Sequence, residues 1–166
     1  VPEGASRYRS EYSSVLTAIY TKQGNTEGLS AILKRKFRDF PTMGTFQELL
    51  DVVGEDAKEA LVDEEIKHIL QDTMLKLYYL EFILTYGKVA DAETYLFARA
   101  DKIAGNRYET LEHCAMIFEE KQSFLATSLI FRGLLDAILE KGYTKSYPYG
   151  VRYLQKLDNL DPLVSD

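Results

Sequence analysis

The sequence contains no tryptophan, a single cysteine and only 4 prolines in 166 residues. The lone cysteine, Cys114, excludes an internal disulfide and is typical of a reducing compartment. So few prolines leave room for long uninterrupted helices. No apolar run approaches the roughly 20 residues that a membrane span requires, and no signal peptide is visible. We therefore expect a cytoplasmic protein with no membrane segment.

The sequence also lacks a dominant positive charge. Its net charge is -6 at pH 7, and no basic stripe is available to a phosphate backbone, so we expect no nucleic-acid partner. The most basic patch consists of Lys34, Arg35, Lys36 and Arg38. We interpret this patch as the solvated side of a short helix.

Catalytic motifs are missing as well: there is no phosphate-binding glycine loop, no H-E-x-x-H and no G-x-S-x-G elbow. Glu65-x-x-His68 matches half of a di-iron carboxylate site, but the only other histidine, His113, has its acidic neighbours at a different spacing. Adjacent helical residues such as His113 and Cys114 do not face each other. We predict no catalytic residue, no metal ligand and no cofactor. The 26 acidic residues offer many pairs, so the sequence leaves open a pair of carboxylates for acid–base catalysis. We favour a non-enzymatic role.

What the sequence does contain is helical periodicity, clearest over Ser123–Leu154. Apolar residues recur there at steps of three and four, which predicts a central helix packed on several sides. Gly142 is the expected end of this helix, and Pro148 fits the first turn of the next one. The recurring residues are Ala126, Leu129, Ile130, Gly133, Leu134, Ala137 and Ile138.

Arg132 and Asp136 lie four residues apart in this apolar helix and form part of a narrow polar stripe. If the two side chains are buried they must be paired, because a lone buried charge is costly. The pattern therefore predicts that Arg132→Ala destabilises the protein more than Arg35→Ala does.

The rest of the chain shows the same helical spacing of apolar residues, and glycines mark the expected helix ends. No segment shows the sustained alternation of apolar and polar residues that is typical of a strand. A first apolar stripe runs from Tyr8 and Tyr12 to a helix end near Gly24. Residues 56–86 are predicted to form either one long helix or two helices broken near Asp72, and we favour two. A further helix is expected over Asp91–Ala104. Two capping boxes are expected, Thr45 with Glu48 and Asn106 with Glu109, the latter just past Gly105.

These patterns predict an all-α fold of about 8–9 helices in antiparallel pairs, because short links favour antiparallel neighbours. Hydrophobic residues make up 46% of the chain, enough for one domain over residues 1–166. A first residue other than methionine, Val1, is consistent with a domain cropped from a longer chain. Leu96–Ala100 aligns with Leu129–Gly133 at an offset of 33, close to the period of about 34 in helix-turn-helix repeats. The expected architecture is a TPR/HAT-like α-solenoid or a right-handed helical array.

From Leu80 to Leu154 the chain resembles an uncharacterised bacterial family of TPR-like or HAT-like helical proteins, some of which carry a SWIM-type zinc finger elsewhere. The resemblance implies an α-helical repeat fold in a cytoplasmic bacterial setting and no established activity. Tyr149 and Tyr153 stand where the family pattern has histidines, and Ala104 replaces its acidic residue. The residues that carry the resemblance are Ala98, Arg99, Gly105, Tyr108, Leu129–Asp136, Tyr147, Arg152 and Leu154.

Tyrosine is abundant, with 12 copies, and several of them crowd near the C-terminal end together with arginines. These two residue types are enriched at binding hot spots, so they could line a groove. The interpretation we favour is that they tie the last helices together by satisfying buried carbonyls and Asp136. The candidate binding residues are Arg99, Tyr108, Arg132, Asp136, Tyr147, Tyr149 and Arg152.

Our first functional hypothesis is a non-enzymatic helical-repeat module that binds a protein or peptide partner. The alternative is a binder of a small anionic ligand, or an enzyme, with a pocket formed by Arg99, Arg132, Tyr108 and Tyr149. Self-association is a further expectation, because the apolar faces of terminal helices must be covered.

Overall fold

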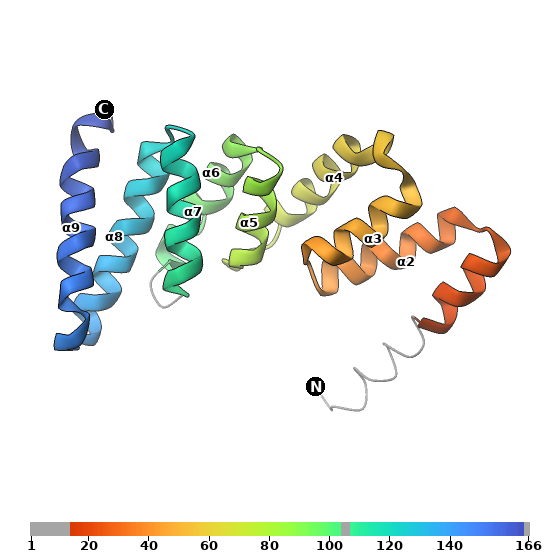
Figure 1. The fold of residues 1–166 in the computed structure, drawn as a ribbon, viewed down its shortest axis with the longest axis horizontal. Coiled ribbons are helices and arrows are strands. Elements are labelled where there is room, and N and C mark those ends of the chain that lie inside the picture. The colour runs from red at the N-terminus through yellow and green to blue at the C-terminus, as the bar shows by residue number, and fades with distance from the viewer. Residues whose placement is uncertain (1–13, 104–106, 165–166) are drawn as a thin grey trace. The chain divides into compact units, whose positions relative to one another are not determined.

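The computed structural model describes residues 14–103 and 107–164, which are helical and contain no strand, as the sequence predicts (Figure 1). Short 3-10 helices lie at Glu55–Ala57, Ala100–Lys102, Thr144–Ser146 and Asp161–Leu163. The predicted features at Tyr8, Tyr12, Gly105 and Asn106 lie outside the described residues. The α-helices are residues 14–23, α2 (Thr26–Asp39), α3 (Met43–Val53), α4 (Lys58–Leu70), α5 (Leu77–Thr85), α6 (Val89–Phe97), α7 (Tyr108–Glu120), α8 (Phe124–Lys141) and α9 (Tyr147–Leu160).

The chain divides into two compact units, Val1–Glu64 and Glu65–Asp166, and each is described by itself. That the chain forms a single domain stays a prediction. In neither described part is any helix both long and apolar enough to cross a membrane.

In the first unit α2 packs against α3. Phe37 of α2 meets Phe46 of α3 edge to face, with ring centroids 5.4 Å apart, and both rings are buried. The predicted basic patch lies on α2, where Lys34 pairs with Glu64 at 2.6 Å and Lys36 pairs with Glu48. The patch is therefore a helix side, as expected, and its charge is partly neutralised by acidic neighbours.

The capping box of α3 differs from the predicted one. The helix begins at Met43, and the side chain of Thr42 accepts a hydrogen bond from the Thr45 N–H at 3.1 Å. Thr45 in turn accepts one from the Thr42 N–H at 3.1 Å. The predicted pair of Thr45 with Glu48 is wrong, because the first turn of the helix lies three residues earlier and Glu48 instead reaches Lys36 of α2.

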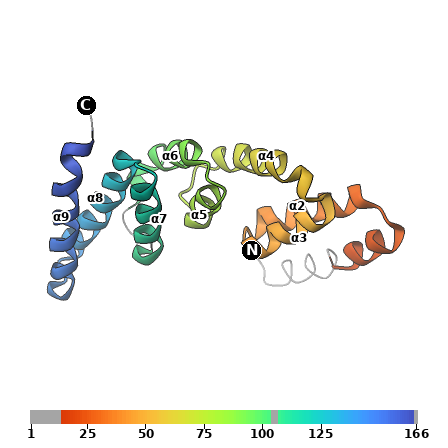
Figure 2. The ribbon, with the colours of Figure 1, turned by 45° about the horizontal axis from the view of Figure 1, so that its top comes forward.

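In the second unit α5 packs on α6 and on α7, α7 packs on α8, and α8 packs on α9. The expected break near Asp72 is confirmed, since α4 ends at Leu70 and α5 begins at Leu77. The consecutive helices α5–α6, α7–α8 and α8–α9 pack as antiparallel neighbours (Figure 1). Both views of the unit place α8 between α7 and α9 (Figures 1 and 2).

The two helix pairs share one turn geometry. Gly87 between α5 and α6 has φ +70°, and Gln122 between α7 and α8 has φ +60°. In each turn this residue donates to the carbonyl three residues back, and the next residue donates to the carbonyl five residues back. The two turns are 35 residues apart, so the structural repeat differs by two residues from the offset of 33 suggested by sequence. Gln122 holds a left-handed conformation that glycine adopts more easily.

Helix α8 has the boundaries that the sequence predicts. Gly142, with φ +62°, follows its last residue, and Pro148 lies in the first turn of α9. Ile130 and Leu134 are buried, but Leu125 and Leu139 are exposed, so the helix is covered on fewer sides than expected.

The expected buried pair on α8 is absent, because Arg132 and Asp136 are both exposed. Within the described residues no hydrogen bond or ion pair joins them. The prediction that Arg132→Ala destabilises the protein more than Arg35→Ala therefore loses its basis.

Helix α6 is shorter than predicted. It ends at Phe97, well before Ala104, and the backbone leaves helical geometry at Arg99 with φ -132° and ψ 23°. The Arg99 side chain is engaged there with carbonyl groups of the α4–α5 connection, Leu70 and Asp72. A tertiary contact has replaced the last turn of the helix.

Candidate functional site

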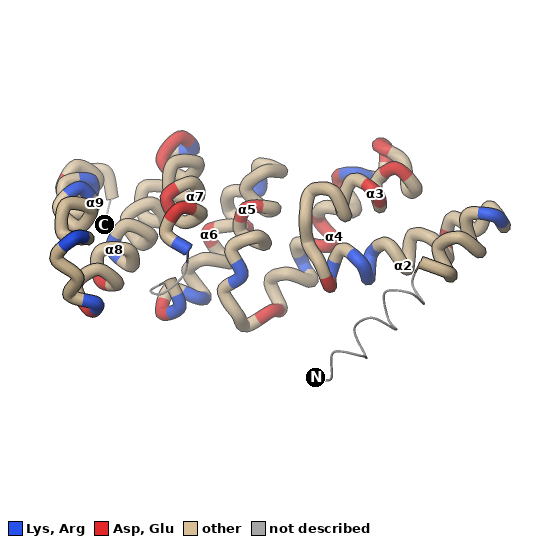
Figure 3. The backbone as a smooth tube through the Cα atoms, turned by 60° about the horizontal axis from the view of Figure 1, so that its bottom comes forward, with Lys and Arg blue, Asp and Glu red and all other residues tan. Residues whose placement is uncertain are grey.

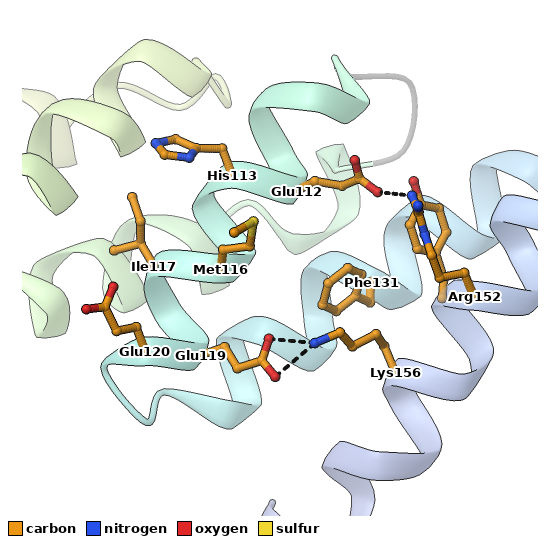
Figure 4. A pocket seen from close by; sticks show the side chains of 10 residues that line it. Glu112, His113, Met116, Ile117, Glu119, Glu120, Phe131, Arg152 and Lys156 are labelled. Carbon is orange, nitrogen blue, oxygen red and sulfur yellow. Dashed lines mark hydrogen bonds and ion pairs between the residues drawn. The ribbon is translucent and has the colours of Figure 1, made fainter.

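An open groove of about 700 Å³ lies over α8 and spans from α7 to α9 (Figure 4). We refer to it as the α7–α9 groove. Its centre carries the Met116 side chain, which is 64% exposed. The lining residues are Glu112, His113, Met116, Ile117, Glu119, Glu120, Phe131, Arg152, Tyr153 and Lys156.

Two ion pairs connect α7 to α9 across the groove. Glu112 accepts from Arg152 at 2.7 Å, and Glu119 accepts from Lys156 at 2.9 Å. The order along both helices is the same, so α7 and α9 run in the same direction, as equivalent helices of successive pairs do. Each pair is partly solvated and is worth about 0–1 kcal/mol. The pairs therefore set the spacing of the two helices more than they stabilise the fold.

Aromatic side chains form the floor of the groove. Phe131 of α8 and Tyr153 of α9 are almost fully buried, and their ring centroids lie 5.7 Å apart. Burial, and after it the neighbouring Glu112 carboxylate, raises the pKa of Tyr153 to about 12. The phenol thus stays neutral at physiological pH and can donate a hydrogen bond but not act as a base.

Of the predicted binding residues, Arg152 lines the groove and Tyr149 lies beside it. The Arg152 guanidinium sits 5.2 Å from the centroid of the Tyr149 ring. Tyr147 is exposed on α9. Tyr108 is exposed at the start of α7, where its hydroxyl donates to Glu109 at 3.2 Å. The exposed Arg132 and Asp136 lie on α8 outside the groove lining.

Arg99 lies elsewhere and is only 4% exposed. Its guanidinium donates to the carbonyl of Tyr95 at 2.7 Å and to that of Leu70 at 3.1 Å, with a third bond to Asp72. It also stacks on the Tyr95 ring, 3.9 Å from the centroid. These contacts tie α6 to the α4–α5 connection. Neither Arg99 nor Arg132 lines the α7–α9 groove, and the pocket of Arg99, Arg132, Tyr108 and Tyr149 stays a prediction.

Sequence reasoning did not identify Glu112, Met116, Glu119 and Lys156 as groove residues. One signal was present: Glu112 and Glu119 are seven residues apart, and Arg152 and Lys156 are four apart, so each set shares a helix face. Which acid faces which base depends on how two helices pack, and the spacing alone does not contain that information.

The cysteine and the histidines considered for chemistry have different surroundings. Cys114 is fully buried, and burial raises the pKa of its thiol to about 12. His68 and His113 are exposed. Among the residues that the structure describes, no group of three or more His, Cys, Asp and Glu side chains is placed to hold a metal ion. The absence of a metal site and of a cofactor stays a prediction.

The described elements thus define an all-α protein of packed helix pairs that carries an open surface groove. The chain belongs to a family of unknown function, DUF6880, whose model matches residues 9–166. No curated protein and no solved structure matches the chain. The resemblance noted over Leu80–Leu154 is therefore supported as membership of an uncharacterised helical family, and its likeness to TPR-like or HAT-like proteins stays a prediction.

Proposed function

We propose that this protein is a TPR-like helical-repeat module that binds a peptide segment of a partner protein in the α7–α9 groove and catalyses no reaction. The observation that carries the proposal is the exposed Met116 at the centre of an open groove with an aromatic floor. Stacked helical repeats commonly use such surfaces to bind partners. Methionine adapts its shape to different apolar side chains and is frequent at binding surfaces.

The arrangement of the helices supports the same proposal. α7 and α9 run in the same direction and are joined by ion pairs of long charged side chains, and the floor between them is formed by Phe131 of α8 and Tyr153 of α9. A peptide can lie between the two helices without disturbing the packing of α8. The single buried cysteine supports a reducing, cytoplasmic setting.

The test is selection of a displayed random peptide library on the full chain, followed by affinity measurements on the selected peptides by fluorescence anisotropy. Met116→Asp places a charge at the centre of the groove. Met74→Asp is the matched control, because Met74 is 58% exposed, lies in the α4–α5 connection and does not line the groove.

We expect selected peptides to bind the Met116→Asp protein at least about tenfold more weakly than the unmodified chain. This factor corresponds to the loss of one anchor contact worth about 1.4 kcal/mol of binding free energy. The Met74→Asp protein should bind them as the unmodified chain does. Failure to select any peptide, or selection of peptides that are indifferent to Met116→Asp, would overturn the proposal.

A further inference from the structure

We infer that the segment bound in the α7–α9 groove is basic and amphipathic, with lysine or arginine side chains flanking an apolar anchor. This inference rests on the proposed function and adds the chemical class of the partner.

Helix α7 is strongly acidic. It carries four glutamates and no lysine or arginine, and acidic residues recur along its length (Figure 3). Three of the four, Glu112, Glu119 and Glu120, line the groove.

The basic residues of the groove are already engaged. Arg152 and Lys156 are its only lysine and arginine lining residues within the described chain, and each forms an ion pair with a glutamate of α7. Glu120 is exposed and has no hydrogen bond or ion pair with any other residue that the structure describes. The groove thus presents an uncompensated negative charge beside the exposed Met116.

The position of this charge is unfavourable for the helix that carries it. Glu119 and Glu120 are the last two residues of α7, where the helix dipole disfavours negative side chains. A cationic partner at this end would complement both the carboxylates and the dipole. An acidic segment would instead have to displace Glu112 or Glu119 from its base before it gained a favourable contact. Charge complementarity therefore selects a basic occupant.

The direct test compares two synthetic peptides of about 14 residues, the usual length of a short helix, by fluorescence anisotropy. They share the same apolar anchors and differ only in having lysine or glutamate at every charged position. Glu120→Lys reverses the unpaired charge. Glu140→Lys is the matched control, because Glu140 is also exposed near the C-terminal end of its helix but does not line the groove.

We expect the lysine peptide to bind at least about tenfold more tightly than the glutamate peptide at low salt, with the difference shrinking as the Debye length falls from about 10 Å to about 3 Å between 0.1 and 1 M salt. Glu120→Lys should weaken binding of the lysine peptide about 3–10-fold. Glu140→Lys should leave it unchanged.

Tighter binding of the glutamate peptide, sensitive to Met116→Asp, would overturn the basic partner while leaving the peptide-binding function in place. Binding of the lysine peptide that responds equally to Glu120→Lys and Glu140→Lys would also overturn the inference, since attraction would then come from overall charge. If neither peptide binds in a way that depends on Met116, the inference fails, and the library selection still decides the proposed function separately.

Discussion

Replacement of Arg99 by alanine should be among the most damaging single substitutions in the second unit. The guanidinium satisfies three backbone carbonyls, those of Tyr95, Leu70 and Asp72. Leaving a buried acceptor without a partner costs about 1–3 kcal/mol, with the lower figure appropriate for the two partly buried carbonyls. Loss of stacking on Tyr95 adds about 1 kcal/mol.

One feature of Arg99 acts in the opposite direction. Its Nε is buried and has no hydrogen-bond partner among the described residues, so truncation removes one unsatisfied donor. We therefore expect a net loss of about 3–4 kcal/mol in the free energy of unfolding, a large part of the about 5–15 kcal/mol that a domain has.

The assay is equilibrium urea unfolding followed by circular dichroism, with Arg132→Ala as the control. Arg132 is exposed and has no partner among the described residues, so its truncation should change the free energy of unfolding by no more than about 0.5 kcal/mol. A loss below about 1 kcal/mol for Arg99→Ala, or equal losses for the two variants, would refute the assignment of Arg99 as the structural arginine.

Three further predictions concern other elements. Gln122→Gly should raise the free energy of unfolding by about 0.5–1 kcal/mol in urea denaturation, because relief of the left-handed strain exceeds the added entropy of the unfolded chain; a destabilised variant would contradict this. Thr42→Ala should lower the melting temperature through loss of about 1 kcal/mol of capping, and an unchanged melting temperature would place the helix start elsewhere. The pKa of Cys114 is raised to about 12 in the folded protein, whereas an unfolded thiol ionises near 8.5. The unfolded state therefore loses its proton first, and stability should fall as pH rises from about 8.5 toward 12, with a shallower fall in Cys114→Ala. Identical pH slopes for the two proteins would exclude a buried thiol.

The elements that could be predicted from sequence are those fixed by local signals. Gly142 and Pro148 delimit α8 and the start of α9 because backbone conformation at these positions depends on few neighbours. The start of α3 was misplaced because Thr42 and Thr45 are both competent caps, and the choice between them is made by the packing of the first turn. Helical periodicity also predicted the position of the break between α4 and α5.

The candidate site was less accessible to sequence reasoning. Arg152, one of the predicted binding residues, lines the α7–α9 groove, but Arg99 and Arg132 could not be told apart from sequence. Arg132 lies in the more apolar helix and is exposed, whereas Arg99 follows a short helix and is buried. Whether an arginine is buried depends on carbonyl groups far away in the chain, here those of Leu70 and Asp72. The local sequence around the arginine does not predict these contacts.

The most direct test of the central claim, that the α7–α9 groove is the binding surface, is NMR of the protein labelled with ¹³C at its methionine methyl groups. The chain has three methionines, and Met43, Met74 and Met116 are all exposed, at 47%, 58% and 64%. Titration with a selected peptide should shift the Met116 methyl signal and leave the other two in place. A shift confined to Met43 or Met74, or no shift at saturating peptide, would contradict the account.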